Sequence, residues 1–289
     1  MPIRIHVNGH LCLPEEAVVP VFDRGFLFGD SVFETLGTNH GRLVFFPEHL
    51  NRLSRSAERI YLSLPSRREI EEAVRETLAA AENPESRVRI MVTRGDSQGD
   101  LDPGKAGPPR LVVIVQPLGE PTPELYEHGV EVEIVSVTRN LPRAIDPLVK
   151  SGNYLNNVLA LGEARRRRPS VHEAVLCAAN GSVAEGATSN VFAVVAGELS
   201  TPSLDVGILD GVTRGKVIDL ARNNSIGCCE VPFMSPDELR RAEEVFLTSS
   251  VRGVLPVTQV DGFAVGNGKP GAITQRVMRH YRHLVEEQT

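Results

Sequence analysis

One lysine of this sequence has surroundings suited to nucleophilic chemistry. Among 31 basic residues, the lysines are Lys105, Lys150, Lys216 and Lys269. Lys150 ends the apolar stretch Pro147-Leu148-Val149 and precedes Ser151-Gly152-Asn153-Tyr154. An amine in a partly apolar setting can attack a carbonyl group. A single lysine is more often a surface charge, so chemistry at Lys150 has to be supported by its neighbours.

Other motifs for catalysis or binding are incomplete. Residues 211–216 contain glycines and a lysine, but Val217 replaces the serine or threonine that a nucleotide-phosphate loop needs for magnesium. Residues 266–271 match a dinucleotide-binding glycine pattern outside any βαβ unit, which indicates a turn. The histidines are scattered, and Cys12, Cys177, Cys228 and Cys229 suggest neither a disulfide framework nor a Cys-x-x-Cys pair. We therefore predict no metal site.

Five separated blocks of sequence carry a family resemblance. They are 23–34 (DRGFLFGDSVFE), 49–53 (HLNRL), 150–157 (KSGNYLNN), 185–192 (EGATSNVF) and 209–214 (LDGVTR). In this order they resemble the signature of class IV aminotransferases, the fold-type IV group of pyridoxal-phosphate enzymes, over nearly the whole chain. The group includes branched-chain and D-amino-acid aminotransferases, (R)-amine transaminases and 4-amino-4-deoxychorismate lyases. The resemblance implies pyridoxal 5′-phosphate as the cofactor.

By this resemblance, three residues take part in the cofactor chemistry. Lys150 would form a Schiff base with the cofactor aldehyde and, once released, carry a proton at the substrate α-carbon. Glu185 resembles the carboxylate that keeps the pyridine nitrogen protonated, which makes the ring a better electron acceptor. The ordinary alternative for Glu185 is an exposed strand residue. Tyr154 resembles the tyrosine that hydrogen-bonds the phenolic oxygen of the cofactor.

Three places in the sequence are candidates for binding the cofactor phosphate. Arg52 matches the bidentate ligand of the family, since its planar fork fits phosphate geometry, although it could also be a surface arginine. Val212 and Thr213 open a predicted helix, whose free N–H groups and dipole favour a phosphate. Ser249 and Ser250 lie in the block 248–257, which resembles the second phosphate-binding turn of the family.

The residues expected to bind the substrate carboxylate differ between branches of the family. The D-amino-acid branch has Arg-x-His after its Thr-Arg-Gly segment, whereas here residues 93–95 (TRG) precede Asp-Ser-Gln. The branched-chain branch has Tyr-x-Arg on the preceding strand, and this chain has Arg87-Val88-Arg89. Strand alternation puts Arg87 and Arg89 on one face, where they form either an anion site or an exposed basic face.

Three functions stay open. Phe28 and Phe33 resemble aromatic pocket walls suited to aliphatic side chains, which favours an aminotransferase for branched-chain or related amino acids with 2-oxoglutarate. Thr35 replaces a glycine of the branched-chain enzymes and resembles the lyase branch, so a D-amino-acid or (R)-amine transaminase or an aminodeoxychorismate lyase is the second function. A non-catalytic phosphate-binding protein is the third, although Lys150, Glu185 and Arg52 together argue against it.

The pattern of elements predicts an α+β protein with a small α/β N-terminal domain and a larger β-rich C-terminal domain. Pro117, Pro121 and Pro123 predict a linker over 118–125, between domains 1–117 and 126–289, because proline excludes regular elements. The expected strands are 3–7, 10–12, 31–38, 42–46, 88–93, 111–116, 130–137, 245–248 and several within 174–199. The expected helices are 47–60, 66–82, 154–166, 211–223, one opening at the capping box 235–238, and 272–287.

The composition excludes several classes of partner. The 289 residues are 41% hydrophobic and 24% charged, with a net charge of −6, which gives no general attraction to nucleic acid or anionic membranes. The basic run 165–168 is interpreted as a solvated helix end. Neither a signal peptide nor a membrane-spanning stretch is recognisable, so we expect a cytoplasmic enzyme acting on small amino and keto acids. The resemblance also implies a homodimer, in which the segment around Phe28 completes the pocket of the other subunit.

Overall fold

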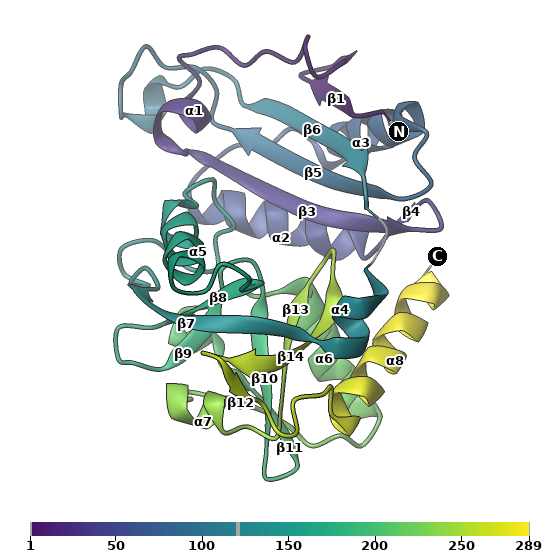
Figure 1. Ribbon diagram of the computed structural model, residues 1–289. Helices are drawn as coiled ribbons and strands as arrows, with labels where there is room; N and C mark the ends of the chain where they lie inside the picture. The colour runs from purple at the N-terminus through teal and green to yellow at the C-terminus, as the bar shows by residue number, and fades with distance from the viewer. Residues whose placement is uncertain (1, 120–121, 289) are drawn as a thin grey trace. The chain divides into compact units, whose positions relative to one another are not determined.

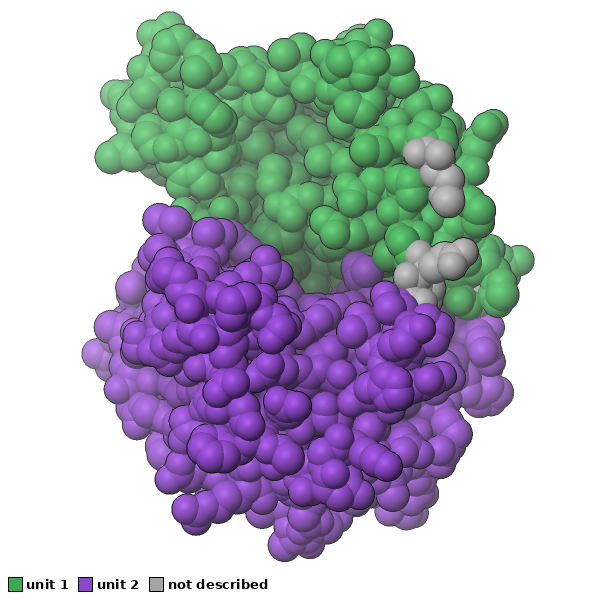
Figure 2. All heavy atoms as spheres, in the orientation of Figure 1, with its two compact units in different colours: residues 1–120, 149–153, 288–289 green, residues 121–148, 154–287 purple. Residues whose placement is uncertain are grey.

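The computed structural model describes residues 2–119 and 122–288, and the chain divides into two compact units (Figure 2). Unit 1 is Met1–Glu120, Val149–Asn153 and Gln288–Thr289, and unit 2 is Pro121–Leu148 and Tyr154–Glu287. The sequence analysis did not separate residues 149–153, which include Lys150, from the second domain. Each unit combines helices with a sheet, and the predicted α+β class is confirmed.

The sheet of unit 1 has six antiparallel strands in the order β2-β1-β6-β5-β3-β4. Asn8 and Gly9 have φ angles of 45° and 88°, which confirms the predicted tight turn between the first two strands. The strands are β1 (Arg4–Val7), β2 (His10–Cys12), β3 (Ser31–Asn39), β4 (Arg42–Leu43), β5 (Ser86–Thr93) and β6 (Arg110–Pro117).

Helices α2 (Phe46–Arg59) and α3 (Arg67–Ala81) cover one face of this sheet (Figure 1). Both confirm predicted helices, because their apolar residues recur at helical spacing and pack into one core with the strands. Ser66 caps α3 in a reciprocal capping box with Glu69. The unit also contains the short helix α1 (Arg24–Phe28) and the 3-10 turn η1 (Pro103–Lys105), neither of which we predicted.

The predicted strand 42–46 is shorter than expected. Strand β4 stops at Leu43, and α2 begins at Phe46. Phe45, the residue before α2, has a φ of 51°, in the left-handed region that strands do not use. Pro47 lies in the first turn of α2, where its fixed φ favours the helix. The backbone conformations of Phe45 and Pro47 therefore end the second strand of this hairpin before residue 46.

The pairing of β3 with β5 decides which side chains share a face of the sheet. Thr35 lies opposite Arg89, and Gly37 lies opposite Arg87. Directly opposed residues project to the same side, so the expectation that both arginines share one strand face is confirmed. Phe33 belongs to this face, while its neighbour Glu34 projects to the opposite face, toward α2.

The segment that carries Lys150 pairs with the start of β3 in unit 1. Phe33 N donates to Lys150 O at 2.9 Å, and Gly152 N donates to Ser31 O at 2.9 Å. A Cβ on Gly152 would lie 2.3 Å from Ser31 Oγ, so any other residue here would require the Ser31 side chain to move. The glycine after Lys150 therefore fixes the lysine backbone beside β3.

Unit 2 is built on a nine-stranded sheet in which the order β12-β11-β10-β13-β14-β7-β8-β9 is extended by β15 on β14. It mixes pairings: β7 runs parallel to both β8 and β14, and β11 runs parallel to β12. The strands are β7 (Val130–Thr138), β8 (Glu173–Cys177), β9 (Val183–Gly186), β10 (Asn190–Val195), β11 (Glu198–Pro202), β12 (Cys228–Val231), β13 (Glu244–Ser249), β14 (Gly253–Val260) and β15 (Phe263–Ala264).

The longer helices of unit 2 confirm the predicted helices, whereas α4 was not predicted. The helices are α4 (Pro123–His128), α5 (Leu155–Arg167), α6 (Val212–Asn223), α7 (Pro236–Arg240) and α8 (Ala272–Gln288), with the 3-10 turn η2 (Leu204–Val206). Helix α4 begins inside the predicted linker 118–125, because Pro123 occupies a first-turn position that proline tolerates. Residues 120–121 of that linker lie outside the described residues.

Part of β14 falls in the block 248–257, which the sequence analysis interpreted as a phosphate-binding turn. The structure confines the turn between β13 and β14 to residues 250–252. Leu255, Val257 and Val260 are buried in the core of unit 2, which accounts for the strand. Pro256 argues against a central strand from sequence alone, so this element could not be predicted with the others. Across 2–119 and 122–288, no helix has the length and apolar character to span a membrane.

Candidate active site

Lys150 and Arg89 both lie against the ring of Phe33 in unit 1. Lys150 Nζ is 4.7 Å and Arg89 Cζ is 3.8 Å from the ring centroid. The ring is 3% exposed, so it offers both cations an apolar and electron-rich surface. Three residues that the sequence analysis selected independently are thereby brought together. The cluster places an amine beside a group able to hold a carboxylate.

The other predicted substrate residues lie on the same unit at different distances from this cluster. Thr35 faces Arg89 across the strand pair, and Arg87 lies two residues farther along β5. Arg87 is exposed, whereas Arg89 is half-buried. Phe28 ends α1, and its ring centroid lies 5.3 Å from the Cζ atom of Arg24. Of this set, Thr35 is the cross-strand neighbour of Arg89.

Arg52 is bound to a carboxylate that the sequence analysis did not consider. Its Nε and Nη2 donate to the two oxygens of Glu34 at 2.8 and 2.7 Å. His49 Nδ1 lies 2.7 Å from Glu34 Oε2, and all three side chains are buried. Burial alone would raise the pKa of Glu34, but the charge and hydrogen bonds of Arg52, with His49, hold it well below its usual range. A phosphate contact of Arg52 stays a prediction and would have to use the N–H groups that do not face Glu34.

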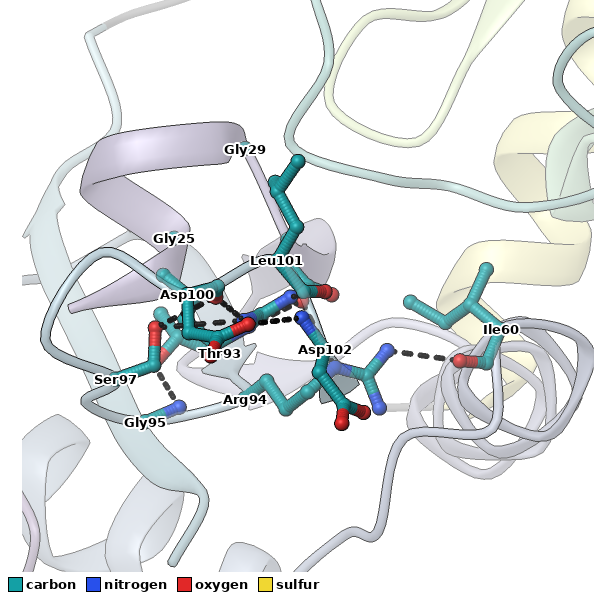
Figure 3. Close-up of polar contacts among 12 residues, drawn as sticks. Gly25, Gly29, Ile60, Thr93, Arg94, Gly95, Ser97, Asp100, Leu101 and Asp102 are labelled. Carbon is teal, nitrogen blue, oxygen red and sulfur yellow. Dashed lines mark hydrogen bonds and ion pairs between the residues drawn. The ribbon is translucent and has the colours of Figure 1, made fainter. Parts of the chain in front are cut away.

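The loop after β5, which lacks the basic pair of the D-amino-acid branch, is held by Arg94 (Figure 3) and by Arg24. Arg94 Nη2 donates to Ile60 O at 2.8 Å, and Arg94 Nε donates to Asp30 Oδ2 at 2.8 Å. Arg24 Nε donates to the same oxygen at 2.8 Å, and its Nη2 donates to Leu101 O at 3.1 Å. Burial would raise the pKa of Asp30, but hydrogen bonds and charge from the two arginines lower it. The loop backbone is therefore fixed by partly buried charge-assisted contacts.

Glu185 is the centre of a hydrogen-bond network in unit 2. The carboxylate accepts from Arg139 Nε at 2.7 Å, from Leu209 N at 3.0 Å and from Asn190 Nδ2 at 3.3 Å. Glu185 is 4% exposed, so these donors favour the ionised carboxylate in a buried setting. An anionic carboxylate is the form needed to pair with a protonated ring nitrogen. Its burial on β9 rules out the alternative of an exposed strand residue.

Two predicted phosphate sites lie close to this network. Gly211 precedes α6 and approaches Asn190 so closely that a Cβ would lie 2.0 Å from Asn190 Oδ1. Val212 and Thr213 follow as the first residues of α6, whose first turn contains no acidic residue. Their N–H groups therefore start a helix end that favours an anion.

The other predicted phosphate site, at Ser249 and Ser250, lies near the same network because β10 pairs with β13. Asn190 on β10 pairs with Thr248 on β13, next to Ser249 and Ser250. Thr248 Oγ1 is buried, and it has no hydrogen-bond partner within the described part of the chain. An unpaired buried hydroxyl costs free energy, which a bound ligand can recover.

Tyr154 is half-buried and immediately precedes α5, four residues after Lys150.

Comparison with known proteins identifies the family. The model of the family described as amino-transferase class IV matches residues 31–260. The chain is 36% identical to a putative branched-chain-amino-acid aminotransferase of Methanocaldococcus jannaschii over 98% of this chain and 96% of that protein. It is 31% identical to a D-alanine aminotransferase of Bacillus licheniformis over 99% of both. The chain belongs to the class IV aminotransferase family.

Solved structures agree with this assignment. The crystal structure of the Escherichia coli branched-chain amino acid aminotransferase is 30% identical and has a TM-score of 0.90, covering 98% of this chain and 94% of that one. A second branched-chain amino acid aminotransferase, solved with pyridoxamine 5′-phosphate, has a TM-score of 0.92 at 28% identity, covering 99% and 95%. The two-domain fold-type IV prediction is confirmed, and the aminotransferase depends on pyridoxal phosphate.

The residues of each unit fit this cofactor. Taken by itself, unit 1 contains the amine of Lys150. Unit 2, taken by itself, contains the buried carboxylate of Glu185, the opening of α6 and the hydroxyls at 248–250. Bound pyridoxal phosphate supplies an aldehyde that takes up the amino group and a ring that accepts electrons. The donor set matches these demands, with a carboxylate for a cationic nitrogen and N–H and O–H groups for a phosphate.

Sequence reasoning missed the residues that support the predicted ones. Arg139 binds Glu185 from a position 46 residues earlier in the chain. Glu34 and His49 surround Arg52, although both belonged to blocks that resembled the family. Asn190 was also in such a block, and the motif 185–192 could have indicated it. Arg139 had no comparable signal, because its role depends on the alignment of β7 with β8 and β9.

Proposed function

We propose that this aminotransferase moves the amino group of a branched-chain or related aliphatic amino acid to a 2-keto acid such as 2-oxoglutarate. The contact of Arg89 and Lys150 with the ring of Phe33 carries the proposal, since it joins a carboxylate-binding group, an amine and an apolar wall. Relatives named as branched-chain aminotransferases support the same substrate class.

Each site residue receives a role in this proposal. Lys150 Nζ anchors the cofactor and then moves a proton at the substrate α-carbon. Glu185, supported by Arg139, holds a proton on the ring nitrogen, and Tyr154 donates to the phenolic oxygen. The phosphate binds Arg52, the amides of Val212 and Thr213, and the hydroxyls of Ser249 and Ser250.

On the substrate side, we assign the carboxylate to Arg89, with Arg87 as a second arginine on the same face. Phe33, Phe28 and Thr35 are assigned to the walls around the side chain.

Replacing Arg89 by alanine tests the carboxylate assignment. Loss of a charged hydrogen-bonding partner costs about 1.5–3 kcal/mol, which corresponds to a loss of roughly 10- to 150-fold in kcat/KM. An amino acid donor should suffer this loss, whereas a matched amine without the carboxylate should not. Arg87→Ala, on the same strand face but exposed, measures how much the second arginine contributes. An equal loss for both donors in Arg89→Ala would remove the assignment, and the absorbance of the bound cofactor should stay unchanged.

A D-amino-acid aminotransferase is the second candidate. Relatives named as D-alanine aminotransferases are 31–34% identical over nearly the whole chain. Against it, residues 96–98 are Asp-Ser-Gln where that branch has its basic pair. Initial rates with L- and D-donors against 2-oxoglutarate and pyruvate distinguish the two. Preference for L-leucine or L-valine supports the main proposal, and preference for D-alanine supports the second.

We also propose that the enzyme is a homodimer in the cytoplasm. Unit 1 exposes apolar side chains including Val18, Val21 and Phe26, at 78%, 62% and 71%. A group of exposed apolar residues of this kind is typical of an interaction surface. Phe26→Asp should convert a sedimenting dimer into a monomer, and a wild-type monomer that keeps full activity on dilution would contradict the dimer. The four cysteines are free, which supports a reducing compartment.

A further inference from the structure

We propose that unit 2 carries a second anion-binding site, in which Arg165 and Arg252 hold a carboxylate or phosphate group of a small molecule. The site is a cavity of about 520 Å³ where the end of α5 meets the start of β8 (Figure 1). Ligand sites commonly have volumes of this order. None of its lining residues was assigned to the cofactor or the amino acid, although Arg252 donates to Ser249, which we assign to the cofactor phosphate.

Arg252 forms one wall of the cavity and is held by its neighbours. Its Nη2 donates to Glu173 Oε2 at 2.8 Å, and its Nη1 lies 2.8 Å from His172 Nε2. An arginine can only donate, so His172 Nε2 is the acceptor and the ring is neutral in this contact. Burial lowers the pKa of His172, and the charge of Arg252 lowers it further. Nη2 also donates to Thr188 Oγ1 at 2.6 Å, and Nε donates to Ser249 Oγ at 3.2 Å. A guanidinium has five N–H donors, so these contacts hold Arg252 in place and leave one N–H of Nη1 for a ligand.

Arg165 supplies the second charge from the last turn of α5. It is exposed, and it makes no hydrogen bond or ion pair with any residue of 2–119 or 122–288. Ser170, also on the cavity wall, adds a hydroxyl. The neighbouring arginines of the basic run differ in this respect: Arg167 pairs with Glu163, and Arg168 pairs with Glu131 and Glu133.

The charges of the cavity favour an anion. Its lining contains two guanidinium groups and one carboxylate, Glu173. Glu173 is 3% exposed and forms an ion pair with Arg252 at 2.8 Å, so these two charges offset each other and the charge of Arg165 remains. An anion in the cavity would therefore pair with Arg165 and accept the remaining N–H of Arg252. The planar fork of Arg165 matches carboxylate and phosphate oxygens.

Isothermal titration of the holoenzyme with inorganic phosphate, and separately with malonate, tests the proposal. Saturating the enzyme with cofactor keeps its own phosphate site filled. We expect one saturable site for at least one probe below about 10 mM, and the tighter probe gives the ligand class. Arg165→Gln should weaken it by about tenfold or more. Arg166→Gln is the matched control, because Arg166 is the adjacent exposed arginine of the same helix and does not line the cavity.

The outcomes separate a built site from general charge attraction. Weakening by Arg165→Gln with unchanged binding in Arg166→Gln supports the site. The proposal is overturned if neither probe saturates, if Arg165→Gln binds as the wild type does, or if both variants lose affinity equally. Circular dichroism of Arg165→Gln should match the wild type, since the side chain is exposed and makes no contact that folding needs. The result does not depend on which amino donor the enzyme uses.

Discussion

Replacing Glu34 by glutamine is expected to destabilise the protein strongly, because Arg52 would keep a buried charge without its counter-ion. Glu34 is fully buried and Arg52 is 4% exposed, and two hydrogen bonds of 2.8 and 2.7 Å join them. His49 adds a third contact of 2.7 Å. Breaking a buried ion pair by removing one partner costs about 3–5 kcal/mol. We expect Glu34→Gln to fall in that range.

Urea unfolding followed by circular dichroism measures the effect. Glu71→Gln is the matched control, since Glu71 also binds two arginine positions but on the exposed face of α3, where the loss should be below about 1 kcal/mol. The double variant Glu34→Gln/Arg52→Met removes both charges and should recover most of the stability. A loss below about 1 kcal/mol in Glu34→Gln, or a double variant no more stable than the single one, would refute the reasoning.

The same pair predicts a pH dependence. Burial alone would raise the pKa of Glu34, but Arg52 and His49 lower it below its unfolded value. A depressed folded pKa gives stability that is fully present above the unfolded value, near about 4.3, and is lost as the pH falls below it. The stability difference between wild type and Glu34→Gln should therefore shrink below about pH 4. A difference that stays constant through this range would contradict a carboxylate held ionised by its partners.

Three further predictions concern the cofactor. Borohydride reduction and peptide mapping should place the pyridoxyl label on Lys150, and a label on Lys216 would reject the assignment. Glu185→Gln should retain the cofactor but lower turnover by about a hundredfold or more, whereas near-wild-type turnover would exclude its role on the ring nitrogen. Gly211→Ala should weaken cofactor binding, because the new Cβ would lie 2.0 Å from Asn190 Oδ1. Gly215→Ala is its control, since nothing lies within 4 Å of that Cβ, and equal affinities in the two variants would argue against the close approach.

The sequence alone determined the local elements and the family. Helix α3 could be predicted with its capping residue, because a capping box and helical spacing are encoded within a few residues. The Asn-Gly turn of β1 and β2 was predictable for the same reason. Motifs with special residues at fixed spacing predicted Lys150 and Glu185 as site residues, since their chemistry restricts the residue types nearby. Prolines at 123 and 256 misled the prediction, because their cost depends on position within a helix or sheet.

Tertiary structure decided which side chains meet. Arg52 binds Glu34 through the packing of α2 on the sheet, and Arg139 binds Glu185 across 46 residues of chain. The return of residues 149–153 to unit 1, which puts Lys150 against Phe33, likewise depends on pairing with β3. The proposed second anion-binding site likewise combines Arg165 of α5 with Arg252, which follows β13. Local patterns fix the backbone over a few residues, whereas these contacts arise from strand register and packing between distant segments, which no short stretch of sequence encodes.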